Sequence, residues 1–177
     1  TTCALTKSGA VQCWAATTNA NALSAYTLTG LGTVVDLAVG GSRACAVNAA
    51  GSVNCWDKES GAPAGGPVAT SPFTQVDAFG GVACGATTGG SAACWGISLA
   101  TGEPSLPPAG LTGVTQVAVG NDFACAVVTA GSVSCWQTGL IAPATGVLAF
   151  AAGLTDVRSI EAGGGTLCAN KRATGEV

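Results

Sequence analysis

The sequence predicts an all-β repeat protein whose sheets contain three or four short antiparallel strands each. Four times, a cysteine is followed ten residues later by a second cysteine and then directly by a tryptophan. A glycine lies at the same place inside each pair, and the first cysteines recur about every 41 residues. A fixed period of this length indicates a repeat architecture, and three or four strands per period are typical of a β-propeller blade. The repeated residues are Cys3, Gly9, Cys13 and Trp14; Cys45, Gly51, Cys55 and Trp56; Cys84, Gly90, Cys94 and Trp95; and Cys125, Gly131, Cys135 and Trp136.

Each complete repeat contains three predicted strands in a constant order, and the two partial repeats contain two of them. The first is an apolar, β-branched stretch that ends at a glycine. The second strand carries the first cysteine and the third carries the Cys-Trp pair, and the glycine between them suits a hairpin turn with a left-handed residue. The stretches that we expect to form first strands are residues 34–39, 73–79, 114–119 and 157–162.

Variable loops separate the repeats and contain all seven prolines. We expect a fourth, weaker outer strand in each loop. The loops are residues 15–30, 57–72, 96–110 and 137–153. The whole chain is then one propeller segment, with repeats at approximately 1–30 (partial), 31–72, 73–110, 111–153 and 154–177 (partial).

Regular cysteine spacing predicts four disulfides, one within each of the first four repeats. A hairpin would bring the two cysteines of a repeat opposite each other, and such bonds form in oxidising compartments. Buried free thiols and a metal site are the alternatives. Because the chain has no histidine and no CxxC motif, we expect neither a metal site nor a cofactor.

The ninth cysteine, Cys168, has no second cysteine ten residues later, so we predict that it is unpaired within the chain. Two explanations are open: the chain is a segment of a longer polypeptide, or it is a ring closed by its own termini. Both ends supply the same first-cysteine strand, which favours the segment. Cys168 would then pair beyond Val177 or with another chain.

Residues 41–56 and 120–136 resemble the regulator-of-chromosome-condensation (RCC) repeat in its secreted, cysteine-containing form, and residues 2–14 match part of a further unit. The resemblance implies a β-propeller, commonly of seven blades, so that this chain would be an arc of a larger ring. The loops depart from the family pattern. Only Gly96 keeps the glycine that usually follows the tryptophan, and the usual histidine is missing, with Arg43 and Phe123 near its place.

No catalytic site is predicted. The absence of histidine removes the most common general base. Asp57 and Glu59 form the nearest acidic cluster, for which a solvated loop is a better interpretation than a cation site.

Three further acidic residues are predicted near strand ends: Asp36, Asp77 and Glu161. They could line one face of the molecule together, or they could be ordinary turn and edge residues. We prefer the second interpretation. The four tryptophans are expected to pack beside the disulfides as structural residues, with an aromatic ligand platform as the alternative.

Composition limits the classes of function. The net charge of −3 and the scattered basic residues disfavour nucleic acid, and no apolar run is long enough for a membrane helix. Charged residues form 8% of the chain, against roughly 25% in ordinary domains. So uncharged a surface suits contact with neighbouring blades, domains or other subunits.

The first hypothesis is therefore a non-catalytic structural or interaction module of a larger extracellular or cell-surface protein, such as a filament, sheath or adhesin component. An alternative is a secreted binding or inhibitor propeller that uses its loops, where Tyr26 and Phe150 are the available aromatic residues. A remote alternative is a nucleotide-exchange regulator, which the RCC resemblance raises and the acidic balance disfavours.

Overall fold

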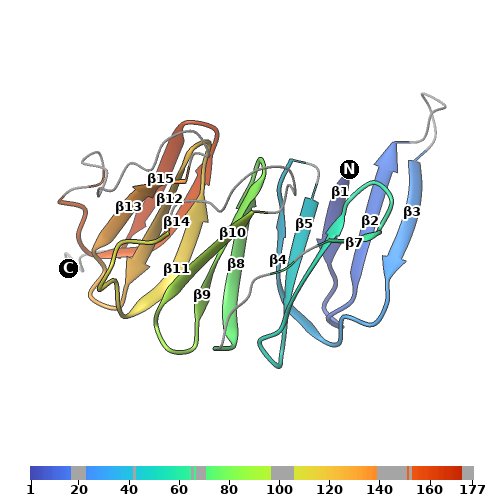
Figure 1. Ribbon diagram of the computed structural model, residues 1–177, viewed down its shortest axis with the longest axis horizontal. Helices are drawn as coiled ribbons and strands as arrows, with labels where there is room; N and C mark the ends of the chain where they lie inside the picture. Colours follow the sequence, from blue (N-terminus) through green and yellow to red (C-terminus); the bar gives the residue numbers. More distant parts are fainter. Residues whose placement is uncertain are drawn as a thin grey trace, which may run out of the picture.

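The structure is a computed structural model of the chain, and it describes residues 1–16, 23–41, 43–64, 66, 71–96, 106–138, 151 and 153–172. The regular elements of these residues are β-strands, which form five antiparallel sheets. The sheets stand side by side in the order of the sequence, from the N-terminal end to the C-terminal end (Figure 1). We call them blades 1 to 5.

Blades 2 to 4 each begin with one of the expected apolar strands. Blade 2 contains β4 (Val34–Val39), β5 (Arg43–Asn48), β6 (Val53–Asp57) and β7 (Pro63–Ala64). Blade 3 contains β8 (Phe73–Phe79), β9 (Val82–Thr87) and β10 (Ala92–Gly96). Blade 4 contains β11 (Val114–Val119), β12 (Phe123–Val128) and β13 (Val133–Gln137). The strands of each blade pair in chain order.

The two end blades contain different strands. Blade 1 contains β1 (Thr2–Leu5), β2 (Val11–Ala16) and β3 (Leu23–Leu28). Blade 5 contains β14 (Val157–Gly163) and β15 (Thr166–Lys171). We call β4, β8, β11 and β14 the inner strands, because each lies beside the next one along the row. No described strand occupies the inner-strand position of blade 1.

The expected strand at 157–162 is extended by one residue, and the other three inner strands have the expected bounds. Of the expected fourth strands, β3 lies in the loop 15–30 and β7 in the loop 57–72. In the loops 96–110 and 137–153, residues 97–105 and 139–150 lie outside the described part of the chain.

Each cysteine hairpin has its two cysteines directly opposite each other, as in the register of Cys45 with Cys55. The four pairs form disulfides with a Cα–Cα distance of 4.0 Å in every case: Cys3–Cys13, Cys45–Cys55, Cys84–Cys94 and Cys125–Cys135. The ninth cysteine, Cys168, is free and exposed on β15.

The core lies between neighbouring blades rather than within one of them. Four buried clusters are formed mainly by valine, alanine and disulfide cysteines from adjacent sheets. Alanines of the first-cysteine strands, such as Ala44 and Ala124, are completely buried. Small side chains allow the sheets to approach closely, and the contacts between blades therefore determine the architecture.

Candidate functional site: the junctions between blades

The hairpin glycines form the first repeated contact between blades. The carbonyl oxygen of Gly51 accepts a hydrogen bond of 2.9 Å from the backbone N–H of Phe73, which begins the next inner strand. The same bond joins each of the other three hairpins to the following blade: Gly9 to Val34, Gly90 to Val114, and Gly131 to Val157.

Gly51 shows why this place requires glycine. Its φ of +79° is in the left-handed region, and a Cβ atom there would lie 2.3 Å from the Cβ of Pro72. A larger residue would therefore be strained by its backbone and would also push the next blade away. The glycine pattern of the sequence thus reflects both the turn and the contact with the next blade.

Polar side chains of the inner strands form the second repeated contact. Asp36 of β4 accepts a hydrogen bond of 2.8 Å from the backbone N–H of Val76 in β8. Gln75 of β8 makes two bonds to the backbone of Val117 in β11: Oε1 accepts from the N–H at 2.8 Å, and Nε2 donates to the carbonyl oxygen at 3.2 Å.

Gln116 repeats the arrangement of Gln75 one blade later, with bonds of 2.9 Å and 2.8 Å to the backbone N–H and carbonyl oxygen of Ile160. A register shift just before the third residue of each inner strand accompanies these contacts, as between Val114 and Gln116. Such β-bulges turn a side chain away from its usual direction. We call these side-chain contacts the inner clasps.

Asp77 forms a further clasp, because its Oδ2 atom accepts a hydrogen bond of 2.7 Å from the backbone N–H of Val119. The preferred interpretation of Asp36 and Asp77 as ordinary turn and edge residues is therefore wrong: both lie within strands and hold the next blade. Gln75 and Gln116 were missed altogether. The signal available in the sequence was a carboxylate or amide side chain at the third position of three of the four predicted first strands.

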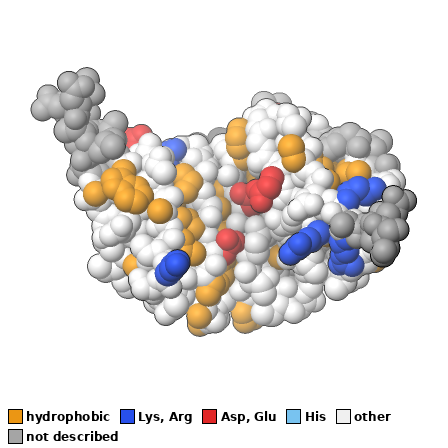
Figure 2. Space-filling view, turned by 180° about the vertical axis from the view of Figure 1, so that it is seen from behind, with side chains coloured by type: hydrophobic (Ala, Val, Ile, Leu, Met, Phe, Trp, Pro, Cys, Tyr) orange, Lys and Arg blue, Asp and Glu red, His pale blue; other side chains and the backbone are white. Residues whose placement is uncertain are grey.

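Burial changes the acidity of both clasp aspartates. It raises the pKa of Asp36 and of Asp77, because a charged carboxylate loses hydration between the sheets, and the backbone N–H donors oppose this rise. The charges of Glu161 and Asp36 add to the rise in the pKa of Asp77, so the three acidic residues share one region. Seen from behind, acidic side chains gather near the middle of the face (Figure 2).

Glu161 occupies in β14 the place that Asp77 has in β8, four residues after the start of the strand. Its side chain is exposed at the open end of the row, where no described blade follows. The described residues contain no group of three His, Cys, Asp or Glu residues that could hold a metal ion.

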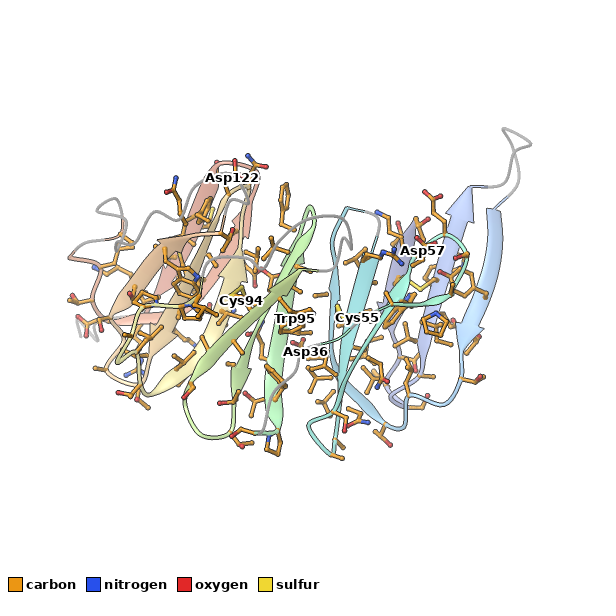
Figure 3. All side chains as sticks on the ribbon, viewed as in Figure 1. Asp36, Cys55, Asp57, Cys94, Trp95 and Asp122 are labelled. Atoms are coloured by element: carbon orange, nitrogen blue, oxygen red, sulfur yellow. A yellow bond between two sulfur atoms is a disulfide. The ribbon has the colours of Figure 1, made fainter. Side chains whose placement is uncertain are left out.

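Each buried tryptophan packs against the preceding blade. Trp95 of blade 3 lies in the same cluster as Cys45 and Cys55 of blade 2, and its ring meets that of Phe73 edge-on at a centroid distance of 5.6 Å. Figure 3 shows Asp36 and Trp95 where the sheets of blades 2 and 3 face each other. Trp136 packs with Cys84 in the same way, and Trp56 packs with Cys13.

This arrangement differs from a ligand platform, because Trp56, Trp95 and Trp136 are buried. Trp14, in blade 1, is half-buried. These three buried tryptophans therefore fill the junctions between blades, and each packs beside a disulfide. The disulfide is that of the preceding blade, which a pattern within one repeat does not reveal.

The loop after β6 is a closed turn. Oδ1 of Asp57 accepts hydrogen bonds from the backbone N–H of Ser60 at 2.9 Å, from its hydroxyl at 2.8 Å and from the N–H of Glu59 at 3.1 Å. These donors lower the pKa of Asp57, and Arg43 contributes from 4.0 Å. Asp57 therefore organises the loop.

Tyr26 joins this loop to blade 1, because its hydroxyl donates a hydrogen bond to the carbonyl oxygen of Lys58. Burial raises the pKa of Tyr26, and the charge of Asp57 adds to the effect. Nζ of Lys58 in turn donates to the carbonyl oxygen of Gly40 at 3.1 Å. Two aromatic residues were considered for binding through the loops. Tyr26 contacts the neighbouring blade through its hydrogen bond to Lys58, and Phe150 lies outside the described residues.

Comparison with solved structures identifies the architecture of the chain. The structure is similar to the CRINKLY WD40 ectodomain of the Arabidopsis thaliana receptor kinase ACR4, with a TM-score of 0.60 and 21% identity over 94% of this chain and 54% of that one. It is also similar to human WBSCR16, with a TM-score of 0.67 and 18% identity over 90% of this chain and 54% of that one. The chain has a β-propeller fold.

A third similar structure is Prp20p from Saccharomyces cerevisiae, with a TM-score of 0.57 and 18% identity over 79% of this chain and 42% of that one. The chain thus spans about half the length of these propellers or less. At the level of sequence, no family model and no curated protein matches it. Among the described residues, no helix is long and apolar enough to cross a membrane.

Proposed function

We propose that the chain is a non-catalytic structural and interaction module, a segment of an RCC-type propeller within a larger extracellular or cell-surface protein. The observation that carries this proposal is the set of four disulfides, one in each of blades 1 to 4. Disulfides at such density belong to oxidising compartments. The five repeats that we inferred from the sequence would then be consecutive blades of one ring, commonly of seven.

Two kinds of observation support an interaction role. Asp36 and Asp77 accept hydrogen bonds that hold the next blade, and Asp57 accepts hydrogen bonds that hold its own turn. In addition, similar propellers include a receptor ectodomain, and Prp20p is described as binding Gsp1p and histones. A surface for other proteins is therefore the function that this fold and this chemistry support best.

The test is to detect the natural polypeptide with antibodies raised against residues 1–177. Cells are alkylated before lysis, and medium, surface and cytosolic fractions are run with and without reductant. We expect a polypeptide much longer than 177 residues, in the medium or at the surface, whose mobility falls on reduction as the hairpins open. A cytosolic polypeptide with all cysteines alkylated would contradict the proposal, and a short, monomeric secreted chain would favour the binding or inhibitor alternative.

A further inference from the structure

Blade 5 carries half of the basic residues of this chain. Arg158 lies in β14, Lys171 ends β15 and Arg172 follows it, and all three are exposed. The chain contains six Lys and Arg residues in all, and charged residues form only 8% of it. Figure 2 shows Lys and Arg side chains gathered toward the right-hand end of the face, apart from the acidic side chains near its middle. We call Arg158, Lys171 and Arg172 the basic corner.

The pairing of β14 with β15 brings these three residues together. Lys171 is opposite Val157, and the backbone N–H of Arg172 donates a hydrogen bond of 2.7 Å to the carbonyl oxygen of Asp156. Arg158 is the residue at the register shift that follows Val157, next to this pairing. Because neighbouring strands lie about 4.8 Å apart, the long side chains of the basic corner can reach one and the same anionic group.

Both arginines occupy places that are open to solvent in blades with a neighbour on each side. Arg158 is at the register shift of its inner strand, and Arg172 is four residues after the first cysteine of its repeat. The residues at these two places are exposed in blades 2, 3 and 4: Val35, Thr74 and Thr115 at the register shift, and Ala49, Thr88 and Thr129 in the hairpin turn. The exposure of the arginines therefore follows from their places in a blade and remains when a further blade is added.

The basic corner has no carboxylate partner within the described part of the chain. The ion pair found there joins Arg43 and Asp57 in blade 2. Asp156 contacts Arg172 through its backbone carbonyl oxygen, and its carboxylate forms no ion pair with the described residues. Three positive charges on adjacent backbones repel one another. A bound anion would offset this repulsion.

We propose that the basic corner binds an acidic polysaccharide through its sulfate or carboxylate groups. The planar guanidinium of each arginine matches such an oxyanion with two parallel N–H donors, and Lys171 adds a third positive charge. The inference deepens the proposed function by naming a class of partner. It rests on that function for the extracellular setting, in which such polymers surround cells.

The surroundings of the corner disfavour other anionic partners. Protein interfaces depend on buried aromatic or other large anchors, and membrane-binding surfaces insert apolar side chains. The large apolar residues exposed in the described part of the chain lie outside blade 5: Leu5, Val35, Val39 and Leu106. A stiff nucleic-acid duplex needs a long basic stripe, but acidic side chains occupy the middle of this face (Figure 2). A flexible polysaccharide can contact the corner alone.

The first test measures binding to labelled oligosaccharides by fluorescence anisotropy, using the oxidised 177-residue chain at low ionic strength. The probes are a heparin fragment, which carries sulfate and carboxylate, an oligogalacturonate, which carries carboxylate, and a neutral dextran. We expect saturable binding of at least one acidic probe, weakened by added salt because the contacts are exposed, and no binding of dextran. Absence of binding to both acidic probes, or equal binding of dextran, would overturn the proposal.

Variants at matched places locate the site. Arg158→Gln combined with Arg172→Gln should weaken binding at least tenfold. Lys7 is exposed four residues after the first cysteine of blade 1, which is the place that Arg172 has in blade 5. Lys7→Gln therefore removes the same charge from an equivalent turn and should leave binding unchanged, whereas Arg172→Gln alone should weaken it. Equal effects of these two single variants would mean that only net charge matters and would contradict the site.

Amide NMR spectra of the native chain provide a readout that needs no variant. Adding the acidic probe should shift the amide signals of residues 156–158 and 170–172, and shifts centred on another blade would contradict the proposal. Labelled DNA duplex, phosphatidylserine vesicles and an oligoglutamate peptide are measured alongside, and tighter binding of any of them than of both acidic oligosaccharides would overturn the assigned class. None of these results depends on where the natural protein is located, so this proposal and the proposed function fail independently.

Discussion

Single polar side chains hold the blades together at places where the surrounding strand is apolar. Asp77 is the clearest example, because one of its oxygens accepts from Val119 in the next blade and the other from Ala78 in its own strand. An unpaired backbone N–H between two sheets would cost about 1–3 kcal/mol of stability. The carboxylate provides the acceptor, but burial makes its negative charge unfavourable.

This balance predicts how stability depends on pH. The pKa of Asp77 is raised in the folded chain, so the folded state binds the proton more strongly than the unfolded state, whose pKa is about 3.9. The contribution of Asp77 to stability is therefore full below about pH 3.9 and is lost as the pH rises through its folded pKa. Urea unfolding of the native chain and of Asp77→Asn, which keeps an acceptor but does not ionise, measures this contribution across the pH range.

We expect Asp77→Asn to gain stability relative to the native chain as the pH rises from about 3.9 through the raised folded pKa of Asp77. Asp77→Ala should lose about 1–3 kcal/mol at low pH, because two backbone donors lose their acceptor, and the loss should become smaller as the pH rises through the folded pKa of Asp77. Asp122→Asn, at an exposed aspartate on the β11–β12 turn, is the control. A constant difference between the native chain and Asp77→Asn would contradict the assignment.

At the scale of the element, the cysteine hairpin combines a local function with a long-range one. Its disulfide closes a loop with a sequence separation of 10. The bond reduces the number of conformations open to the unfolded chain and thereby stabilises the hairpin by up to about 3 kcal/mol. Its turn glycine then contacts the next blade through the carbonyl oxygen. The hairpin is thus both a stable unit and the connection to its neighbour.

Alanine substitution at two glycines separates these functions. Gly51 and Gly30 both have a φ of +79°, but a Cβ at Gly51 would meet Pro72, whereas a Cβ at Gly30 would meet nothing within 4 Å. Gly30→Ala should cost about 1–2 kcal/mol for the left-handed backbone alone. Gly51→Ala should cost at least about 1 kcal/mol more, because it also overpacks the junction. Thermal unfolding of the two variants tests this, and equal losses would show that the contact with blade 3 is unimportant.

At the scale of the whole molecule, stability depends on how many neighbours a blade has. Blades 2, 3 and 4 each contact a sheet on both sides, while blades 1 and 5 have one described neighbour each (Figure 1). In repeat proteins the stability of each unit is set mainly by its own strands and the adjacent interfaces. Burial of the strands follows the same order: β9, in the middle of the row, is buried along its whole length, whereas β15, at the end of the row, is largely exposed.

Native-state hydrogen exchange should reproduce this order. We expect the amides of β9 and β12 to exchange most slowly, through opening of the whole array, and those of β15 to exchange fastest among the paired strands. The chain is kept oxidised, so that the hairpins stay closed during the measurement. Protection of β15 equal to that of β12 would mean that the array opens as one cooperative unit, against the nearest-neighbour argument.

The sequence by itself determined the repeat, the hairpins and the pairing of the cysteines. These features depend on residues within about ten positions of each other, and the strand at 114–119, for example, could be read from its own apolar pattern. Apolar β-branched stretches and turn glycines restrict the backbone locally, which is why their bounds were predictable.

The tertiary structure alone decided which blade each side chain serves. The bond between Asp36 and Val76 joins residues 40 positions apart, and Trp95 packs on the disulfide of the preceding blade. The clasp residue changes from Asp36 to Gln75 and Gln116, so the sequence showed no constant residue at this place. What these residues share is an acceptor directed at a backbone N–H of the next sheet, and that direction exists only once the sheets are stacked.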